Sequence, residues 1–453
     1  MKKICLFIAL SVMISCAHEE DNLFDMSAAQ RLNESVKSYH DLLESSEFGW
    51  ALEFYIGNED SPTSFVTTTK FYSGNVDMVA EIQMDENHSM SSYEPTYEVF
   101  TSKYSVNGEQ GIVLSFDTHN LPIHYYTEPY SFLGTNPNGY GGDFEFCLLK
   151  TSEDLDTIYM RGKRYGRDTR LVRIHEEGGN YMRALYRMKD LSLFDLGQMT
   201  FDNKSYTIDI YRKRLVIEMD HENQIADQHF FVYNNKGFRL LKPVMFNGCW
   251  LESFEFDNET GVISSQDGRA IAHFPSPYEQ IANTKLDWYI KNTDKSNNFT
   301  AKYNAIASHM LMPPRFPLPQ IFIGTSISRD YSYGILDKKL CFSFRWFFSG
   351  LYGHIQERYL IEMGIDKEKN LIYFNAIEPG GGWGNYFYPA SGISMINDEK
   401  AYIDEIVKHS PYKVEFSMDG IRVKEAKLIS ENDNSIFFTL EERELNDNIL
   451  LLK

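Results

Sequence analysis

The sequence predicts a mainly β protein with a few helices, in which two antiparallel β-sandwich or open-barrel-like domains follow an N-terminal helix. Aromatic residues make up 15% of the chain, and aromatic side chains favour half-buried, pleated surfaces. Short segments of alternating apolar and polar residues recur along the chain, and Gly- and Asn-rich turn signals separate them. This pattern is typical of antiparallel sheets. An α+β arrangement is the alternative.

The first sixteen residues predict a bacterial lipoprotein signal. Lys2 and Lys3 precede an apolar run over residues 4–14, and Ser15-Cys16 follows it. A basic flank, a short apolar run and a small residue before the cleavage point are typical of a signal peptide, and the run is too short for a spanning helix. We therefore expect residues 1–15 to be removed, Cys16 to be lipidated and residues 16–26 to form an acidic tether. Simple secretion is the alternative.

Net charge and cysteine usage exclude several classes of protein. The formal charge of −20 becomes −22 when Lys2 and Lys3 leave with the signal, and a chain this acidic lacks the basic surface that nucleic acid requires. After Cys5 and Cys16, only Cys147, Cys249 and Cys341 remain, without C-x-x-C spacing. We expect three buried thiols; one disulfide with a leftover thiol is the alternative.

A helix should follow the tether. Ser27 and Gln30 have the spacing of a capping box, and Gly49-Trp50 marks the end of the helical pattern. The apolar residues at helical intervals are Ala28, Leu32, Val36, Tyr39, Leu42 and Leu43.

Strands dominate the predicted N-terminal domain, which comprises this helix and a β-rich part over residues 27–274. Their alternating apolar positions are Met78, Ala80, Ile82 and Met84; Ile112, Leu114 and Phe116; Phe144, Phe146 and Leu148; Ile208 and Ile210; Leu215 and Ile217; and Phe254 and Phe256. Turn signals separate them at Asn107-Gly108, Asn138-Gly139, residues 234–237 and Thr260-Gly261.

Residues 275–320 are predicted to form a helical and proline-rich linker. Helical patterns cover residues 278–292 and about 300–312, and four prolines crowd into residues 313–319. A C-terminal β-rich domain should then run over residues 321–453, with strands near 340–348, 355–364 and 371–377 and a helix near 398–408. Its clearest element is a hairpin in which Asp419-Gly420 is the two-residue turn.

Four segments together resemble a family of Bacteroidetes lipoproteins, domain of unknown function 4302. They are residues 24–32, Gly49-Trp50, residues 114–120 with His124 and Pro129, and residues 141–146. The resemblance implies no activity. It implies a context, because such lipoproteins are typically encoded beside TonB-dependent transporters and SusD-like partner lipoproteins. Residues 17–21 also resemble the export signal that sends lipoproteins of this group to the outer face of the outer membrane.

Asp117, His119 and His124 form the best polar cluster. Asp117 and His119 are two apart and share one face of a strand, and His124 can fold back to join them. Nitrogen and oxygen ligands of this type suit zinc or iron, but the sequence supplies no obvious fourth ligand. The alternative is that Asp117 and Asn120 form turn bonds while the histidines lie at a surface rim. We predict neither a metal nor a cofactor.

Asp143 and Glu145 are also two apart and point to the same side of a strand. Paired carboxylates act as acid and base in glycoside hydrolysis. The alternative is a structural role beside Gly141-Gly142, which permits a tight turn or bulge.

Residues 380–388 form the most unusual loop, because four glycines within five residues surround Trp383 and precede Tyr386 and Tyr388. Exposed aromatic side chains on such a loop can stack on a sugar face or enter a partner's pocket. The alternative is that Trp383 packs back onto the sheet.

The sequence contains no H-E-x-x-H, G-x-S-x-G or Walker motif. The leading hypothesis is a non-catalytic lipoprotein on the outer-membrane surface. It would bind the membrane through its lipid anchor and help a TonB-dependent, SusD-like uptake system to capture a glycan, peptide or metal-chelate ligand, or to assemble. One alternative is a surface hydrolase acting on glycan or peptide. The other is a structural scaffold without a small ligand.

Overall fold

A computed structural model describes most of the chain beyond the tether. The described residues are 26–58, 61–80, 97–127, 140–192, 196–211, 213–220, 225–246, 248–282, 287–308, 320–325, 340–347, 354–379 and 392–443. Cys16, the apolar positions Ile82 and Met84, the Asn138-Gly139 turn, the proline cluster and the loop with Trp383, Tyr386 and Tyr388 lie outside them.

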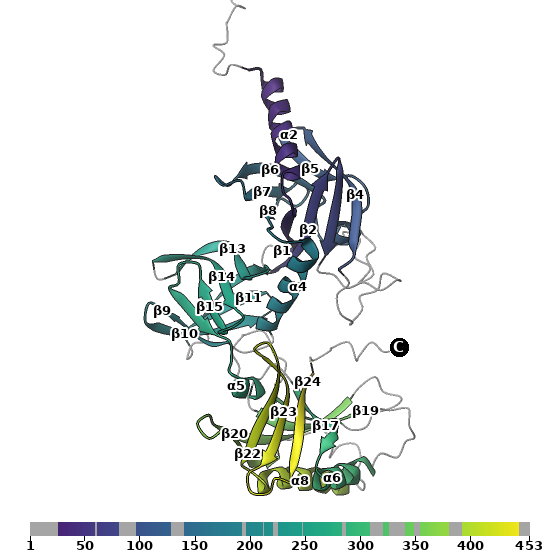
Figure 1. The fold of residues 1–453 in the computed structure, drawn as a ribbon, viewed down its shortest axis with the longest axis vertical. Coiled ribbons are helices and arrows are strands. Elements are labelled where there is room, and N and C mark those ends of the chain that lie inside the picture. The colour runs from purple at the N-terminus through teal and green to yellow at the C-terminus, as the bar shows by residue number, and fades with distance from the viewer. Residues whose placement is uncertain are drawn as a thin grey trace, which may run out of the picture. The chain divides into compact units, whose positions relative to one another are not determined.

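The described part of the chain is mainly β, and its first element is the predicted helix, α2 (Ala28–Glu44) (Figure 1). The Ser27 hydroxyl accepts the backbone N–H of Gln30, and the Gln30 side chain accepts the backbone N–H of Ser27. This reciprocal capping box satisfies two N–H groups that no helical carbonyl can reach, so the helix begins where the sequence indicates.

The strands form three closed antiparallel sheets of eight, each named here by its order along the chain. The first closed sheet contains β1 (Trp50–Asn58), β2 (Ser61–Tyr72), β3 (Asn75–Ala80), β4 (Val99–Gly108), β5 (Ile112–Phe116), β6 (Glu145–Thr151), β7 (Thr157–Gly162) and β8 (Asp168–Arg173). β1 pairs with β8, which leaves neither strand at an edge. Closure therefore removes the unpaired backbone groups that an open sheet exposes.

Aromatic rings fill the interior of the first closed sheet. The Phe116 ring lies 6.2 Å from that of Phe146 and 6.3 Å from that of Phe71, and Phe71 meets Tyr104 edge to face at 4.7 Å. These side chains are buried because they occupy positions that face the interior, and such positions alternate with outward-facing ones along each strand. α2 packs against β4, where the Tyr104 hydroxyl donates to Glu44 over 2.8 Å.

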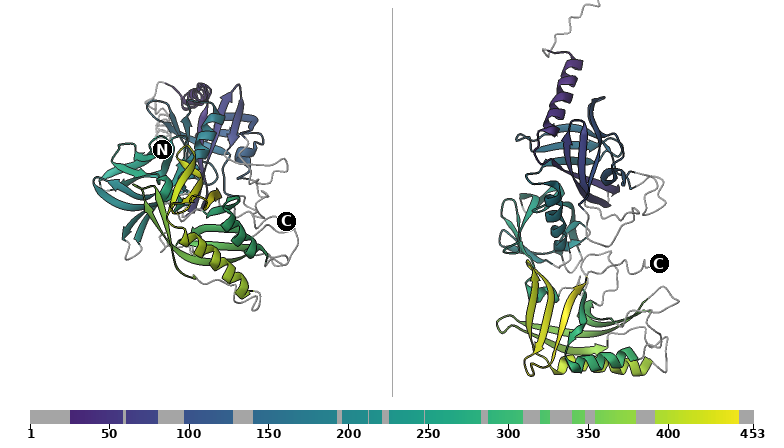
Figure 2. Two further views of the ribbon diagram at one scale, coloured as in Figure 1. Left: turned by 60° about the horizontal axis from the view of Figure 1, so that its bottom comes forward. Right: turned by 45° about the vertical axis from the view of Figure 1, so that its right-hand side comes forward.

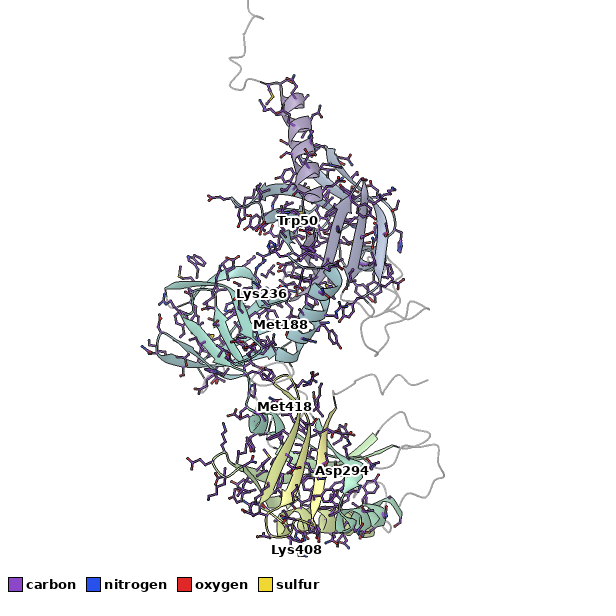
Figure 3. All side chains as sticks on the ribbon, in the orientation of Figure 1. Trp50, Met188, Lys236, Asp294, Lys408 and Met418 are labelled. Atoms are coloured by element: carbon purple, nitrogen blue, oxygen red, sulfur yellow. The ribbon has the colours of Figure 1, made fainter. Side chains whose placement is uncertain are left out.

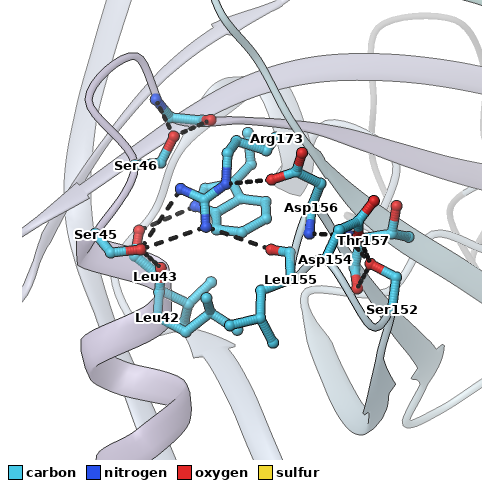
Figure 4. Close-up of polar contacts among 12 residues, drawn as sticks. Leu42, Leu43, Ser45, Ser46, Ser152, Asp154, Leu155, Asp156, Thr157 and Arg173 are labelled. Carbon is cyan, nitrogen blue, oxygen red and sulfur yellow. Dashed lines mark hydrogen bonds and ion pairs between the residues drawn. The ribbon is translucent and has the colours of Figure 1, made fainter.

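Arg173 at the end of β8 joins α2 to the first closed sheet (Figure 4). Its Nε donates to Asp156 over 2.8 Å, and its Nη2 donates to the Leu155 carbonyl over 3.3 Å. Both Nη atoms also reach the Ser45 hydroxyl, the residue that follows α2. One side chain thus connects the end of the helix with the β6–β7 turn.

The second closed sheet follows α4 (Gly178–Met188) and a 3₁₀ turn (Lys189–Ser192). It contains β9 (Gly197–Phe201), β10 (Lys204–Tyr211), β11 (Arg214–Asp220), β12 (Ile225–Tyr233), β13 (Gly237–Phe246), β14 (Cys249–Asp257), β15 (Val262–Ser265) and β16 (Ala270–His273). β16 pairs with β9 and closes it. Phe238 packs between Phe231 and Phe254, with ring centroids 4.7 and 4.8 Å away.

The third closed sheet begins after the short helix α5 (Pro277–Ile281). It contains β17 (Asp287–Lys295), β18 (Gln320–Thr325), β19 (Leu340–Phe347), β20 (His354–Asp366), β21 (Leu371–Pro379), β22 (Tyr412–Asp419), β23 (Arg422–Ser430) and β24 (Phe437–Arg443). α6 (Asn297–Ser308) and α8 (Gly392–Lys408) lie side by side against one end of it (Figure 2). Phe299 of α6 contacts Tyr402 of α8 and Phe438 of β24.

The helix predicted over residues 278–292 is wrong from Asp287 onward. Residues 287–295 instead form β17, which pairs with β24 and β18. Trp288 and Ile290 are both buried there. A short apolar stretch fits a helix or a strand equally well by periodicity, and in this case pairing with two neighbouring strands decides between them.

The hairpin near residue 420 forms, with its turn one residue further along than predicted. Asp419 pairs with Arg422, so Gly420 and Ile421 are the turn residues. Gly420 has a φ of 61°, a left-handed value that favours glycine. The register shifts by one residue between Ser417 and Met418, because β23 has the extra residue Lys424 between their partners Glu425 and Val423.

The mainly β class with an N-terminal helix is confirmed. The region predicted as one domain over residues 27–274 contains the first and second closed sheets. One compact unit of the chain contains α2 and the first closed sheet except residues 61–66 of β2, and the other contains those residues with the second and third closed sheets. The predicted domain boundaries stay predictions. No helix in the described ranges is long and apolar enough to cross a membrane.

Candidate functional site

The candidate site lies at one end of the first closed sheet, where the chain passes from β5 to β6. The short helix α3 (Leu121–His124) follows β5, with Asn120 at its N-cap and Pro122 in its first turn. The Asn120 side-chain amide donates to the Phe100 carbonyl over 3.1 Å and to the Ser102 hydroxyl over 2.9 Å. These bonds attach the start of α3 to β4.

Three rings form a stack at this end, which we call the ring stack: His119, His124 and Phe144. The His124 ring lies 5.3 Å from that of His119 and 5.2 Å from that of Phe144, and its plane is only 27° from that of Phe144. His124 Nδ1 lies 3.1 Å from both the backbone nitrogen and the carbonyl oxygen of Asn120. Phe144 keeps 38% of its surface exposed, so the stack presents apolar ring surface to solvent.

The structure brings His119 and His124 together, but Asp117 bonds to Ser105 instead of joining them. The Asp117 carboxylate accepts the Ser105 hydroxyl across the β4–β5 pair, over 3.1 Å. Among the described residues, no three His, Cys, Asp or Glu side chains gather closely enough to hold a metal ion. His119 is exposed and His124 partly exposed, as expected of a surface rim, but Asp117 and Asn120 bond to residues of β4 rather than forming the turn bonds of that alternative.

Asp143 is buried and supports the β7–β8 turn. Its carboxylate accepts the backbone N–H groups of Arg164, over 2.8 Å, and Tyr165, over 3.3 Å. Burial raises the pKa of this carboxyl above its ordinary value, while the two amide bonds and the charges of Arg167 and Arg164 act in the opposite direction. Gly162 makes room for it, because a Cβ there would lie 2.1 Å from Asp143 Oδ2.

Glu145 forms an ion pair with Lys163 and does not act together with Asp143. Lys163 Nζ lies 3.1 Å from Glu145 Oε1 and 3.0 Å from Glu109 Oε2. The two carboxylates of the proposed acid–base pair thus have separate partners in the β7–β8 turn, which favours the structural role.

The Gly141-Gly142 pair lets two chain segments approach closely. Gly142 donates its N–H to the Tyr126 carbonyl over 3.0 Å, and a Cβ on Gly142 would lie 2.7 Å from Tyr126 Cβ. The Arg167 guanidinium also donates to the carbonyls of Gly141 and Gly57. This packing holds the segment before β6 against the end of α3.

Sequence reasoning missed Phe144 as a surface residue. The alternation of Phe144, Phe146 and Leu148 predicted one buried face, and the latter two are buried as expected. β6 begins only at Glu145, after the bend at Gly141-Gly142, so Phe144 lies outside the alternation. The two glycines were the available signal, because such a pair often ends a strand pattern.

Cys147 is a free thiol of intermediate exposure. The other predicted site residues, Cys16, Trp383, Tyr386 and Tyr388, fall outside the described part of the chain, so their roles stay predictions.

Residues 20–258 match the model of a family described as a domain of unknown function (DUF4302). No curated protein and no solved structure matches the chain. The matched segment covers more than half of the 453 residues and includes the ring stack and the β7–β8 turn. The chain therefore belongs to the DUF4302 family.

Proposed function

We propose that this protein is a non-catalytic, lipid-anchored surface protein that captures a glycan ligand for an outer-membrane uptake system. The ring stack is the observation that carries the proposal. Phe144 is partly exposed, and His119 and His124 extend the aromatic surface beside it. Aromatic faces bury the apolar face of a sugar ring while the sugar hydroxyls stay hydrated, so such a surface suits carbohydrate.

The positions of the carboxylates favour binding over hydrolysis. A glycosidase needs two carboxyl groups that flank the scissile bond. Here Asp143 accepts backbone N–H groups and Glu145 pairs with Lys163. Any catalytic use of either carboxylate would require breaking the bonds that hold the β7–β8 turn.

The anchor and the partners belong to the same proposal. The basic pair, apolar run and Cys16 favour lipidation, and the acidic residues after Cys16 resemble a surface-export signal. We expect a TonB-dependent transporter and a SusD-like lipoprotein as partners, on the grounds of the family context alone.

Binding is best tested on a glycan array with a peptide array beside it. We expect the parent protein to bind at least one glycan class and the variants Phe144→Ala and His124→Ala to lose about tenfold or more in affinity, as loss of a stacking ring predicts. His175→Ala is the matched control, because His175 is an exposed histidine of the same compact unit. Equal glycan binding by the parent and all three variants would show that the glycan does not bind at the ring stack. Binding to peptides alone would show that the ligand is a peptide and not a glycan.

The anchor is tested separately in a bacterium of the Bacteroidetes group. Labelled palmitate should enter the parent but not Cys16→Ala, and surface proteolysis of whole cells should digest the parent. The predicted partners should appear in a cross-linked pull-down of the parent. If labelled palmitate did not enter the parent, the proposed lipid anchor would be wrong, while the proposed glycan binding would be unaffected.

A further inference from the structure

The β7–β8 turn runs directly beside Phe144 of the ring stack. β6, β7 and β8 are consecutive strands of the first closed sheet (Figure 1), and the two residues that flank Phe144 both bond to the backbone of the turn. On one side, the Asp143 carboxylate accepts the Arg164 N–H over 2.8 Å. On the other side, the Glu145 carbonyl accepts the Lys163 N–H over 2.9 Å. The turn can therefore contribute side chains to a ligand that contacts Phe144.

Two guanidinium groups of this turn gather on one ring. The Arg164 Cζ lies 5.0 Å from the centroid of the Tyr165 ring, and the Arg167 Cζ lies 5.1 Å from it. Arg167 is held in place by its bonds to the carbonyls of Gly141 and Gly57. Arg164 is exposed, and a guanidinium that stacks on a ring face can still donate its edge N–H groups to an anion in a bidentate manner.

The turn carries more positive than negative charge. Among the described residues, no carboxylate lies at ion-pair distance from the Arg164 or Arg167 guanidinium. Both positive charges act on Asp143, whose carboxylate is buried and accepts backbone N–H groups. Glu145 is already paired with Lys163. Two guanidinium groups thus share one buried carboxylate, although the formal charge of the whole chain is −20.

Arg161 on β7 shows the ordinary arrangement of an exposed arginine. Its Nη2 lies 2.9 Å from Asp168 Oδ1, and its Nε donates to the same oxygen over 3.0 Å. Both side chains are more than half exposed. Arg161 and Arg164 therefore form a matched pair on one sheet, in which only Arg161 has a carboxylate of its own chain as a partner.

We propose that the ring stack binds an acidic glycan and that the Arg164 guanidinium binds the carboxylate or sulfate group of that glycan. This inference rests on the proposed glycan function and names its ligand class. A sugar ring packs on Phe144, and its anionic substituent accepts N–H groups of Arg164, the pairing to which a planar guanidinium is suited. Because the chain as a whole repels acidic polymers, recognition depends on this local contact.

The test uses the full chain on an array that carries polygalacturonate, alginate, chondroitin sulfate and sialylated glycans beside neutral mannan and xyloglucan. Methyl-esterification neutralises the carboxylates of a bound glycan, and solvolytic desulfation removes its sulfates. Each treatment alone shows which of the two groups is recognised. We expect the parent to bind at least one acidic glycan about tenfold more tightly than its neutralised form, as a charge-assisted hydrogen bond predicts.

Three variants separate the charged contact from the ring contact. Arg164→Gln should weaken binding of the acidic glycan by about tenfold and leave binding of the neutralised form unchanged. Phe144→Ala should weaken binding of both forms, because the ring packs on the sugar whatever its charge. Arg161→Gln is the control and should bind like the parent. Circular dichroism confirms the folding of all three variants.

The outcomes distinguish this inference from the proposed function. Binding of neutral glycans alone, or no preference for the charged form, would overturn the inference and leave the glycan function standing. An Arg164→Gln variant that binds the acidic glycan like the parent, or that loses affinity equally for both forms, would overturn it as well. If the parent bound no glycan on the array, the proposed function would be wrong and this inference with it.

Discussion

The Arg173 guanidinium carbon lies 4.3 Å from the ring centroid of Trp50. Trp50 is fully buried, and its Nε1 donates to the Leu43 carbonyl in the last turn of α2 over 2.9 Å. Trp50, labelled in Figure 3, is thus connected to the helix by this hydrogen bond, and Arg173, labelled in Figure 4, by its bonds to the Ser45 hydroxyl.

Replacement of Arg173 by alanine should weaken this connection. The change removes the bond to Asp156 and the cation–π contact, so we expect the local opening free energy of α2 and β1 to fall by about 1–3 kcal/mol. Native-state hydrogen exchange measures this quantity. Arg161→Ala is the control, because Arg161 and Asp168 are both more than half exposed and such pairs contribute less than about 1 kcal/mol. Equal effects of the two changes would argue against the role of Arg173.

Gly162→Ala should destabilise the β7–β8 turn. The new Cβ would lie 2.1 Å from Asp143 Oδ2 and 2.6 Å from its Cγ, so the carboxylate must move away from the amides that it accepts. Overpacking of this kind costs about 1–3 kcal/mol. Thermal unfolding compares Gly162→Ala with the control Gly111→Ala. A Cβ at Gly111 would meet no atom within 4 Å, so this control should change the free energy of unfolding by no more than about 0.5 kcal/mol.

Asp143 should make stability depend on pH in an unusual direction. Burial raises its folded-state pKa, so the folded protein binds this proton more tightly than the unfolded chain does. The contribution favours folding at low pH and is lost as pH rises from about 3.9 through the raised pKa. Relative to Asp143→Asn, the parent should therefore lose stability as pH rises, measured by urea unfolding from pH 3 to pH 7.

Asp154 supplies the opposite case for the same titration. The Ser152 hydroxyl and the Asp156 backbone N–H lower its pKa, so its contribution is present at neutral pH and is lost as pH falls through the folded-state pKa. Relative to Asp154→Asn, the parent should gain stability as pH rises. The same slope for both aspartates would contradict the assignment for Asp143.

Gln280 on α5 should stabilise the β22–β23 hairpin. Its side chain is fully buried, accepts the Val423 N–H over 2.8 Å, and donates to the carbonyls of Ile421 and Pro275. Gln280→Ala leaves these groups buried without partners, so we expect a loss of about 2–4 kcal/mol. Hydrogen exchange at Val423 reads the effect directly. Gln266→Ala, an exposed glutamine, should show almost none.

Local chemistry made several elements predictable. The capping box of Ser27 and Gln30 and the strand around Leu114 depend on residues within a few positions of one another, and the structure contains both. Residues 113–116 of that strand are all buried, so the alternation in the sequence does not mark an exposed face. The turn at Gly420 was predictable to within one residue, because the Asp-Gly signal is local while the register depends on how β22 and β23 align. β17 was not predictable, because its strand state comes from pairing with β24, about 150 residues later.

The same distinction between local sequence and long-range pairing applies to the candidate site. The sequence by itself determined the family, the strand-rich class, the start of α2 and the candidate polar residues. Each of these depends on composition or on short spacing along the chain. Only the tertiary structure decided that His119 and His124 stack with Phe144 and that Asp143 supports a turn. Those outcomes depend on which strands become neighbours, and a closed sheet sets its neighbours through long-range pairing that no local pattern encodes.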